Sequence, residues 1–279
     1  MDIFTVLLVQ PLTNGLILFY KILFSNMGLA IIGFTVVLKL LLNPLTKPYM
    51  QSMKKMKEYA QEIDKIKKKH AGDKQKQTLA VADFYKQKGI NPGAGCLPYL
   101  LQIVVLIALF NVFSKVLSGD GEVINTINNL LIDPLKLPIG VSLNTQFLYL
   151  DVTRPDVINI ANFPIALPGP LLFLTAFVQV LSAKMMSPYV AKQEKLAKKT
   201  PQGADDFSAS FQKSSLLMFP IFTLLIGMNF ASGLAIYWFM FSAFQMVQQY
   251  RTSGWGGLTD WIRKIKVLKS TYGATGQRS

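Results

Sequence analysis

The sequence predicts an all-α membrane protein with five core transmembrane helices, a cytoplasmic helical hairpin and an N-terminal helix on the outer surface. Hydrophobic residues make up 51% of the chain, yet its formal net charge is +14. Apolar runs long enough to span a bilayer alternate with charged segments. The charged segments also alternate in sign, because residues 47–95 and 187–213 are rich in lysine while residues 118–166 are mostly acidic.

The charges of the loops predict the orientation in the membrane. Lysine and arginine are enriched in cytoplasmic loops, so the two basic loops and the basic tail are expected on the cytoplasmic side. Five spans that start outside end inside, so the span count and the charges agree. The predicted organisation is an N-terminal apolar or interfacial helix (1–27), a transmembrane core (28–250) with a cytoplasmic hairpin (47–92), an outer loop (118–166) and a cytoplasmic loop (187–213), and a cytoplasmic tail (251–279).

Residues 3–24 are apolar but contain Pro11, Asn14 and Gly15. They lack the basic start and the A-x-A cleavage pattern of a conventional signal peptide. Two alternatives stay open: an interfacial helix on the outer face, or a sixth span. Both leave the later topology unchanged.

The first core span, residues 28–46, carries Lys39 near its middle. At ~1.5 Å per residue, Lys39 lies roughly 12 Å before Lys47, which places it close to the bilayer midplane. A charge at that depth costs about 2.5 to 3.5 kcal/mol, so we expect it to face a polar cavity or a partner. Thr35 and Asn43 share its helix face at four-residue spacing. The alternative is a snorkelling lysine, which would not explain these aligned polar residues.

Residues 49–88 read as a soluble helical hairpin after Pro44 and Pro48. Apolar residues recur at helical spacing among many lysines, Ala71-Gly72-Asp73 breaks the helix, and the returning helix offers Leu79, Ala82 and Phe84 or Tyr85. A basic helical pair at the membrane would suit ribosomal RNA, anionic lipid or acidic client segments. A solvated positive-inside loop is an equally weighted interpretation.

The remaining spans also carry polar residues. Gln102 lies inside the span of residues 96–117, and Thr175, Gln179 and Ser182 form a stripe in the span of residues 167–186. Such groups often join helices, at ~0.6 kcal/mol each. Residues 214–250 form a predicted transmembrane hairpin with a short outer turn at residues 229–233, in which Tyr237 is an interfacial anchor or a groove-lining residue.

The sequence contains no known motif for catalysis or for cofactor binding. The single cysteine, Cys96, excludes an internal disulfide and gives no metal cluster. The chain has no P-loop, no HExxH, no GxSxG and no paired intramembrane carboxylates. We therefore expect neither an enzyme nor a bound cofactor, metal or small-molecule substrate.

Four motifs follow one another along the chain: GLAIIGFTVVLKLLLNPLTKPYMQSMKKM, KGINPGAGCLPYLLQ, VQVLSAKMMSP and FPIFTLLIGMNFASGLAIYWFMFSAFQMVQQY. In their order and spacing they resemble the YidC family of membrane protein insertases, which includes the mitochondrial Oxa and chloroplast Albino proteins. The resemblance covers roughly residues 12–250. It implies a short bacterial form in the cytoplasmic (inner) membrane with its C-terminus in the cytoplasm. The family's groove charge, usually arginine in bacteria, falls on Lys39, which lacks arginine's bidentate fork.

The resemblance implies an insertase. A polar or acidic segment of a nascent membrane protein would enter a hydrophilic groove near Lys39 while its apolar helix moves into lipid, without nucleotide hydrolysis. The candidate groove residues are Lys39, Thr35, Asn43, Gln102, Thr175, Gln179 and Tyr237. The implied partners are nascent membrane proteins and lipid; the basic hairpin and tail add the ribosome, and the Sec translocon stays open.

A transporter is the alternative function from another class. It would favour broken helices, internal repeats or an acidic ion partner at the midplane. The sequence shows no repeat, and the five predicted spans contain no aspartate or glutamate. A purely structural assembly factor is a third hypothesis, and it would tolerate leucine or methionine at position 39.

Overall fold

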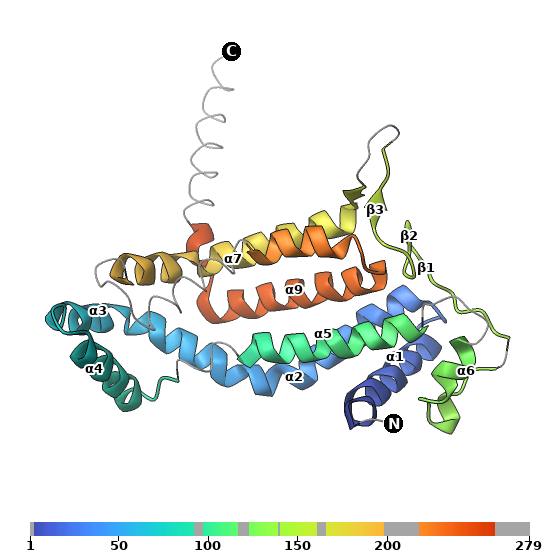
Figure 1. Cartoon of the computed structure of the whole chain (residues 1–279), viewed down its shortest axis with the longest axis horizontal. Coiled ribbons are helices and arrows are strands. Elements are labelled where there is room, and N and C mark those ends of the chain that lie inside the picture. Colours follow the sequence, from blue (N-terminus) through green and yellow to red (C-terminus); the bar gives the residue numbers. More distant parts are fainter. Residues whose placement is uncertain are drawn as a thin grey trace, which may run out of the picture. The chain divides into compact units, whose positions relative to one another are not determined.

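The computed structural model describes residues 3–91, 97–116, 123–138, 140–160, 166–197 and 218–259. Over these residues the chain is mostly helical, as predicted, with a few two-residue strands (Figure 1). The chain divides into two compact units. The first contains Met1–Tyr49, Gly93–Val178 and Pro220–Phe244, and the second contains Met50–Pro92, Gln179–Phe219 and Gln245–Ser279.

The first unit is a helical assembly with an irregular segment, called the outer segment after its predicted position, whose described residues are 123–138, 140–160 and 166–169. Its helices are η1 (Thr5–Val9, a π-helical turn), α1 (Gln10–Ile22), α2 (Met27–Glu58) up to residue 49, α5 (Leu97–Val116), α6 (Val123–Asn128), the 3-10 turn η3 (Asp133–Leu135), the first part of α7 (Pro170–Ala197), the helix Met218–Gly227 from residue 220 onward, and most of α9 (Ser232–Ser253). Pro170 opens α7, where its missing N–H has no partner to lose.

The apolar core of the first unit joins residues that are far apart in the sequence. Leu16 and Ile17 of α1, Ile31 of α2, Leu109 of α5 and Tyr237 of α9 are all at most 1% exposed and belong to one cluster. Two described segments, Thr5–Ile22 and Met27–Leu45, are long and apolar enough to cross a membrane by length and composition, and shorter apolar helices cover Ile103–Phe113, Pro170–Met185 and Met218–Gly227. The five-span core stays a prediction.

The outer segment contains two small antiparallel sheets. Strand β1 (Gln146–Phe147) pairs with β2 (Leu150–Asp151), and β3 (Val157–Ile158) pairs with β4 (Leu167–Pro168). Residues 146–150 carry no helical or strand pattern in the sequence. In the structure they form a tight hairpin whose turn holds Leu148 in the left-handed region, at φ +54°.

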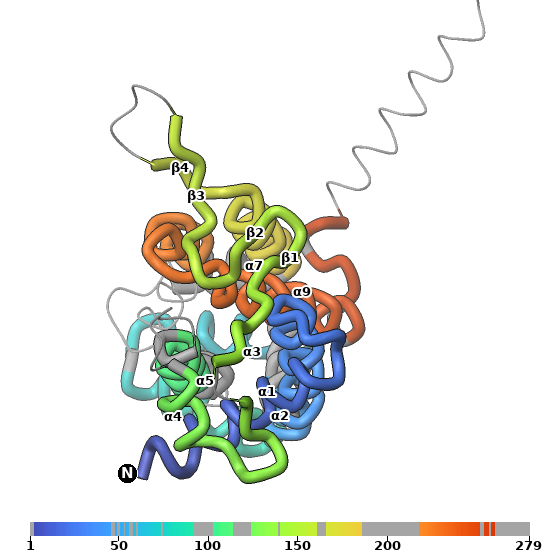
Figure 2. Tube along the Cα trace, turned by 90° about the vertical axis from the view of Figure 1, so that its right-hand side faces the viewer, coloured from blue at the N-terminus to red at the C-terminus, as the bar shows by residue number. Residues whose placement is uncertain are grey.

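This outer segment supplies hydrogen bonds to the N-termini of three helices, and Figure 2 looks toward that end of the first unit. The N–H of Met27 at the start of α2 donates to the carbonyl of Asn144. At α9, the N–H groups of Ser232 and Gly233 donate to the carbonyls of Arg154 and Val152. At α7, the carboxylate of Asp156 accepts from the N–H of Leu172. Because helix N-termini leave N–H groups without partners, one segment satisfies three such ends.

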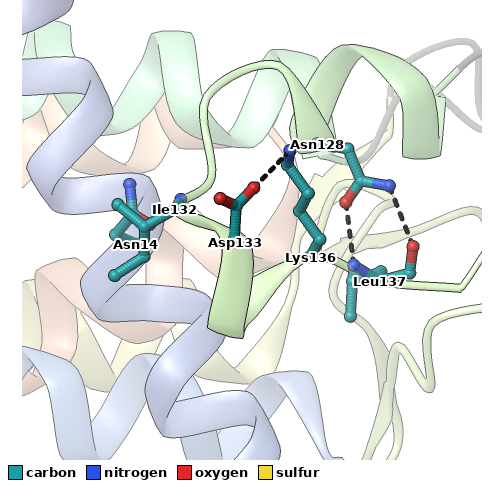
Figure 3. A network of polar contacts seen from close by, with 6 residues as sticks. All are labelled: Asn14, Asn128, Ile132, Asp133, Lys136 and Leu137. Atoms are coloured by element: carbon teal, nitrogen blue, oxygen red, sulfur yellow. Dashed lines mark hydrogen bonds and ion pairs between the residues drawn. The ribbon is translucent and has the colours of Figure 1, made fainter.

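A second set of polar contacts fastens α1 to residues 130–144 (Figure 3). The Asn14 side chain donates to the carbonyl of Leu130 and accepts from the N–H of Ile132, at 2.8 and 2.9 Å. Further along α1, the Tyr20 hydroxyl accepts from the N–H of Asn144, and the Lys21 ammonium donates to the carbonyls of Pro134 and Lys136. Asn128 braces the same segment by exchanging two hydrogen bonds with the backbone of Leu137.

The second unit contains the predicted hairpin, formed by α3 (Ala60–Lys69) and α4 (Lys74–Gln87), which pack side by side (Figure 1). In the structure α3 ends at Lys69 and α4 begins at Lys74, and the Asp73 carboxylate caps α4 by accepting from the N–H of Lys76. Phe84 packs edge-on against Tyr59. Leu79 is 64% exposed, so its predicted place in the hairpin contact is wrong, and Val81 is buried there instead.

The first arm of the hairpin also begins differently from the prediction. Pro44 and Pro48 do not end the membrane helix, because α2 continues through both of them to Glu58. Each proline removes one backbone hydrogen bond, yet neighbouring residues can satisfy the freed carbonyl groups and let the helix continue. The helical arm before the hairpin is therefore an extension of the Lys39 helix.

Candidate functional site

Lys39 projects from the buried face of α2. One and two turns earlier on the same face, Thr35 and Ile31 are each 1% exposed, and Lys39 itself is 8% exposed. The following residues, Leu40 and Leu41, are 54% and 68% exposed and face away. Helical periodicity thus turns the charged residue toward protein and the leucines toward the surroundings.

The Lys39 ammonium lies over the face of an aromatic ring. Its Nζ is 2.9 Å from the ring centroid of Phe241, a residue of α9 in the same unit. The negative face of an aromatic ring attracts a cation, and this attraction is strongest where water is excluded. Within the described residues, Lys39 makes no ion pair with a carboxylate. A snorkelling lysine would lie along lipid with its ammonium in water, which this buried position does not fit.

Tyr237 packs against Phe241 in α9. It precedes Phe241 by one helical turn, is 1% exposed, and its ring centroid lies 6.0 Å from that of Phe241 at an interplanar angle of 49°. Its neighbour Trp238 is also buried and packs edge-on against Phe222. Tyr237 is thus a core side chain of the first unit, so the interfacial-anchor alternative does not describe its surroundings.

The two candidate threonines are buried and bonded to their own helices. The hydroxyl of Thr35 donates to the carbonyl of Ile31 at 2.6 Å, and that of Thr175 donates to the carbonyl of Leu171 at 2.8 Å. Each hydroxyl proton is therefore engaged, while the oxygen keeps lone pairs that can accept a hydrogen bond. Each of these hydroxyl groups can therefore accept, but not donate, a further hydrogen bond.

The other predicted groove residues are Asn43, Gln102 and Gln179. Asn43 is exposed, and Gln179 belongs to the second unit. The side chain of Gln102 lies outside the described residues. Ser182, the last member of the stripe with Thr175 and Gln179, donates to the amide oxygen of Gln249 at 2.9 Å. This hydrogen bond joins α7 to α9, as polar residues within membrane spans often join helices.

Phe241 is the site residue that sequence reasoning missed. A phenylalanine in an apolar helix gives no signal of its own, because packing is its usual role. The available signal is its four-residue spacing from Tyr237, which places the two rings on one helix face. Only the packing of α9 against α2 makes Phe241 the neighbour of Lys39.

A second polar location lies in the outer segment. A pocket of about 390 Å³ is lined by residues of the β1–β2 hairpin and the turn that follows, including Tyr149, Asp151 and Asp156. Asp151 accepts hydrogen bonds from the N–H and hydroxyl of Thr153, and Asp156 accepts from Tyr149 and from the start of α7. The carboxylates of Asp151 and Asp156 in this pocket thus bind groups of the same loop and of the start of α7. Across the described parts of the chain, no group of three or more histidine, cysteine, aspartate or glutamate side chains could hold a metal ion.

Comparison with known proteins gives a consistent result. Residues 18–255 match the family described as 60Kd inner membrane protein. The chain is 33% identical over 272 residues to the membrane protein insertase YidC of Methylobacterium sp. (strain 4-46), an alignment that covers 95% of this chain and 39% of that protein. It is 32% identical over 241 residues to the YidC of Syntrophobacter fumaroxidans, covering 86% of this chain and 37% of the relative.

A relative of more similar length comes from Fusobacterium nucleatum. Its membrane protein insertase YidC is 29% identical over 227 residues, which covers 81% of this chain and 85% of that protein. The chain thus spans about two fifths of the length of the first two relatives but most of the third.

Proposed function

The chain belongs to the 60Kd inner membrane protein family, the YidC/Oxa1 family, and on this premise we propose that it is a membrane protein insertase. Its clients are nascent membrane proteins, and its place is the bacterial inner membrane with the C-terminus in the cytoplasm. The proposal rests on the family match over residues 18–255, and on one structural observation above all: a lysine in the middle of an apolar helix, buried against protein and paired with an aromatic ring.

The proposed mechanism uses Lys39 to hold a polar client segment partway across the membrane. A single carboxylate at the bilayer centre costs about 2.5 to 3.5 kcal/mol, and an ammonium beside it lowers this cost. The apolar helix that follows gains about 0.3 to 0.6 kcal/mol for each strongly apolar residue. About twenty such residues therefore outweigh the cost of one carboxylate, so insertion needs no nucleotide and Lys39 lowers the barrier rather than supplying the drive.

The proposed client groove includes the polar side chains of the neighbouring helices. Thr35 and Thr175 supply acceptors, and Tyr237 supports the ring beneath the ammonium. Asn43, Gln102 and Gln179 remain candidate groove residues on the strength of the sequence. The fixed outer ends of α2, α7 and α9 support a groove that is closed on the outer side, because the outer segment satisfies the N–H groups at all three ends.

The contacts of α1 favour an interfacial helix over a sixth span. Asn14, in the middle of α1, and Lys21, near its end, both bond to residues 130–136. These two positions are roughly 10 Å apart along the helix. If α1 crossed the bilayer, the exposed charges of Asp133 and Lys136 would be carried into lipid alongside it. We infer that α1 lies along the outer surface with its loop partner.

Insertion of a single-span client with a short acidic N-terminal tail tests the proposed function. Cells depleted of their own insertase receive the wild-type protein, Lys39→Arg, Lys39→Gln or Lys39→Glu, and a client with an uncharged tail serves as the control. We expect wild type and Lys39→Arg to insert the acidic client, and Lys39→Gln and Lys39→Glu to fail while remaining folded in the membrane. Failure of the wild type with several clients would contradict the insertase proposal; equal activity of all four would remove Lys39 from the mechanism.

A further inference from the structure

We propose that Phe241 is the resting partner of Lys39 and sets the preference of the site for acidic client segments, an inference that rests on the insertase function proposed above. In the resting protein the ammonium lies on the Phe241 ring. A client carboxylate replaces the ring as the partner of the ammonium, which moves off the ring toward the carboxylate. A neutral segment leaves the ammonium where it is.

The first step of the argument is that the ammonium needs compensation where it lies. Lys39 is 8% exposed, and burial of an uncompensated ammonium is costly. The apolar segments that form the predicted core contain no aspartate or glutamate. Among the described residues, the interaction found for its ammonium is the Phe241 ring at 2.9 Å. The ring therefore replaces part of the hydration that the ammonium has lost.

The second step concerns the strength of this contact. A desolvated cation–π contact amounts to about a tenfold to thirtyfold preference, whereas a carboxylate that forms a charge-assisted hydrogen bond in the same place binds more strongly. A built-in aspartate would therefore occupy Lys39 against any client. An aromatic ring keeps the ammonium in position and gives it up to a client carboxylate.

The third step is that the ring itself is held in place. Phe241 packs against Tyr237, which is 1% exposed and belongs to the core cluster of the first unit. Because Tyr237 fixes one side of the ring, we expect the ammonium to move off a stationary ring rather than draw the ring with it. Lys39 then exchanges one partner, the Phe241 ring, for another, the client carboxylate.

Progressive fluorination of the Phe241 ring tests this inference. Mono-, di- and trifluorophenylalanine at position 241 withdraw negative charge from the ring face with little change of shape. The readout is the insertion rate of a client with aspartate in its N-terminal tail, divided by the rate of an otherwise identical client with asparagine there. Both rates are measured in proteoliposomes at limiting client concentration. We expect this ratio to rise along the series, to about ten times its wild-type value with trifluorophenylalanine, because a fluorinated ring competes less with the client carboxylate for the ammonium. Phe241→Trp should lower the ratio.

Two controls separate this role from packing. The same fluorinated series at Phe110, whose ring packs edge-on against Phe230, should leave the ratio unchanged. In a Lys39→Gln background, insertion of the asparagine client should not change along the series at position 241. A ratio that stays constant or falls along the series with Lys39 present would overturn the proposal, and so would a change in asparagine-client insertion along the series in the Lys39→Gln background. Absence of insertion by the wild-type protein would instead contradict the proposed function.

Discussion

The carboxylate of Asp156 accepts a hydrogen bond of 3.1 Å from the backbone N–H of Leu172, sixteen residues later, at the start of α7. The Tyr149 hydroxyl adds to this cap by donating to Asp156 at 3.3 Å and accepting from the N–H of Leu171 at 2.9 Å. Asp156 is 4% exposed, so water cannot easily replace it. An acidic group at a helix N-terminus also complements the helix dipole.

Asp156→Ala should lower the free energy of unfolding by about 1 to 3 kcal/mol, because it leaves a buried N–H group without a partner. Faster hydrogen exchange at the amide of Leu172 would locate the loss. The matched control is Asp133→Ala, which removes an exposed ion pair with Lys136 and should change stability little. Equal effects of the two substitutions would contradict the buried cap.

Gly169 is the position where the Asp156 carboxylate approaches the backbone most closely. A Cβ atom at residue 169 would collide with the carboxylate oxygen Oδ1. Gly169→Ala should therefore displace Asp156 and destabilise the protein. Gly72→Ala serves as the control, because nothing lies within 4 Å of a Cβ atom there. Thermal unfolding in detergent should show a lower midpoint for Gly169→Ala alone, and an unchanged midpoint would show that the loop moves aside without cost.

Asn14→Leu should release α1 from the outer segment. The substitution leaves the Leu130 carbonyl and the Ile132 N–H without their partner, at a cost of about 1 to 3 kcal/mol where these groups are shielded from water. Limited proteolysis or hydrogen exchange of residues 123–138 should show faster opening. Asn125→Leu, an exposed position in the same segment, is the control. Unchanged exchange in Asn14→Leu would contradict the fastening role of Asn14.

Short sequence patterns predicted the features that depend on residues near one another in the chain, such as helix faces and turns. The i, i+4 spacing placed Thr35 and Lys39 on one helix face, and that face is buried. The run Ala71-Gly72-Asp73 predicted a break in the helix, and in the structure these residues lie between α3 and α4.

Contacts between distant residues were not predictable from such patterns. Asp156 caps a helix that starts fourteen residues later, and Phe241 reaches Lys39 from a helix two hundred residues away in the chain. The predicted hairpin began at residue 49, after Pro44 and Pro48, whereas in the structure α2 continues through both prolines to Glu58. Each of these features is decided by tertiary packing.

The basic tail is expected to contribute to ribosome binding. Its charged residues are almost all positive, with Arg251, Arg263, Lys264, Lys266, Lys269 and Arg278 against Asp260. Deletion of residues 251–279 should weaken binding of the reconstituted protein to ribosomes, and binding of the full chain should weaken as salt rises, because contacts to RNA phosphates release counterions. Co-sedimentation at several salt concentrations measures both. Affinity that neither salt nor the deletion changes would contradict a role of the tail.

Capping by Asp73 makes the start of α4 sensitive to acid. The N–H of Lys76 donates to the Asp73 carboxylate, and this hydrogen bond is the main cause that holds the pKa of Asp73 below its ordinary value of 3.8. A carboxyl group whose pKa is lowered by folding stabilises the folded form above its unfolded pKa, and this contribution is lost as the pH falls through the folded pKa. Hydrogen exchange at the amides of Lys76 and Gln77, corrected for intrinsic rates, should therefore accelerate below about pH 4. Asp73→Asn keeps an oxygen that can cap the helix but has no charge to titrate, so its exchange should lose this pH dependence. If Asp73→Asn showed the same acid transition as the wild type, another group would have to be its source.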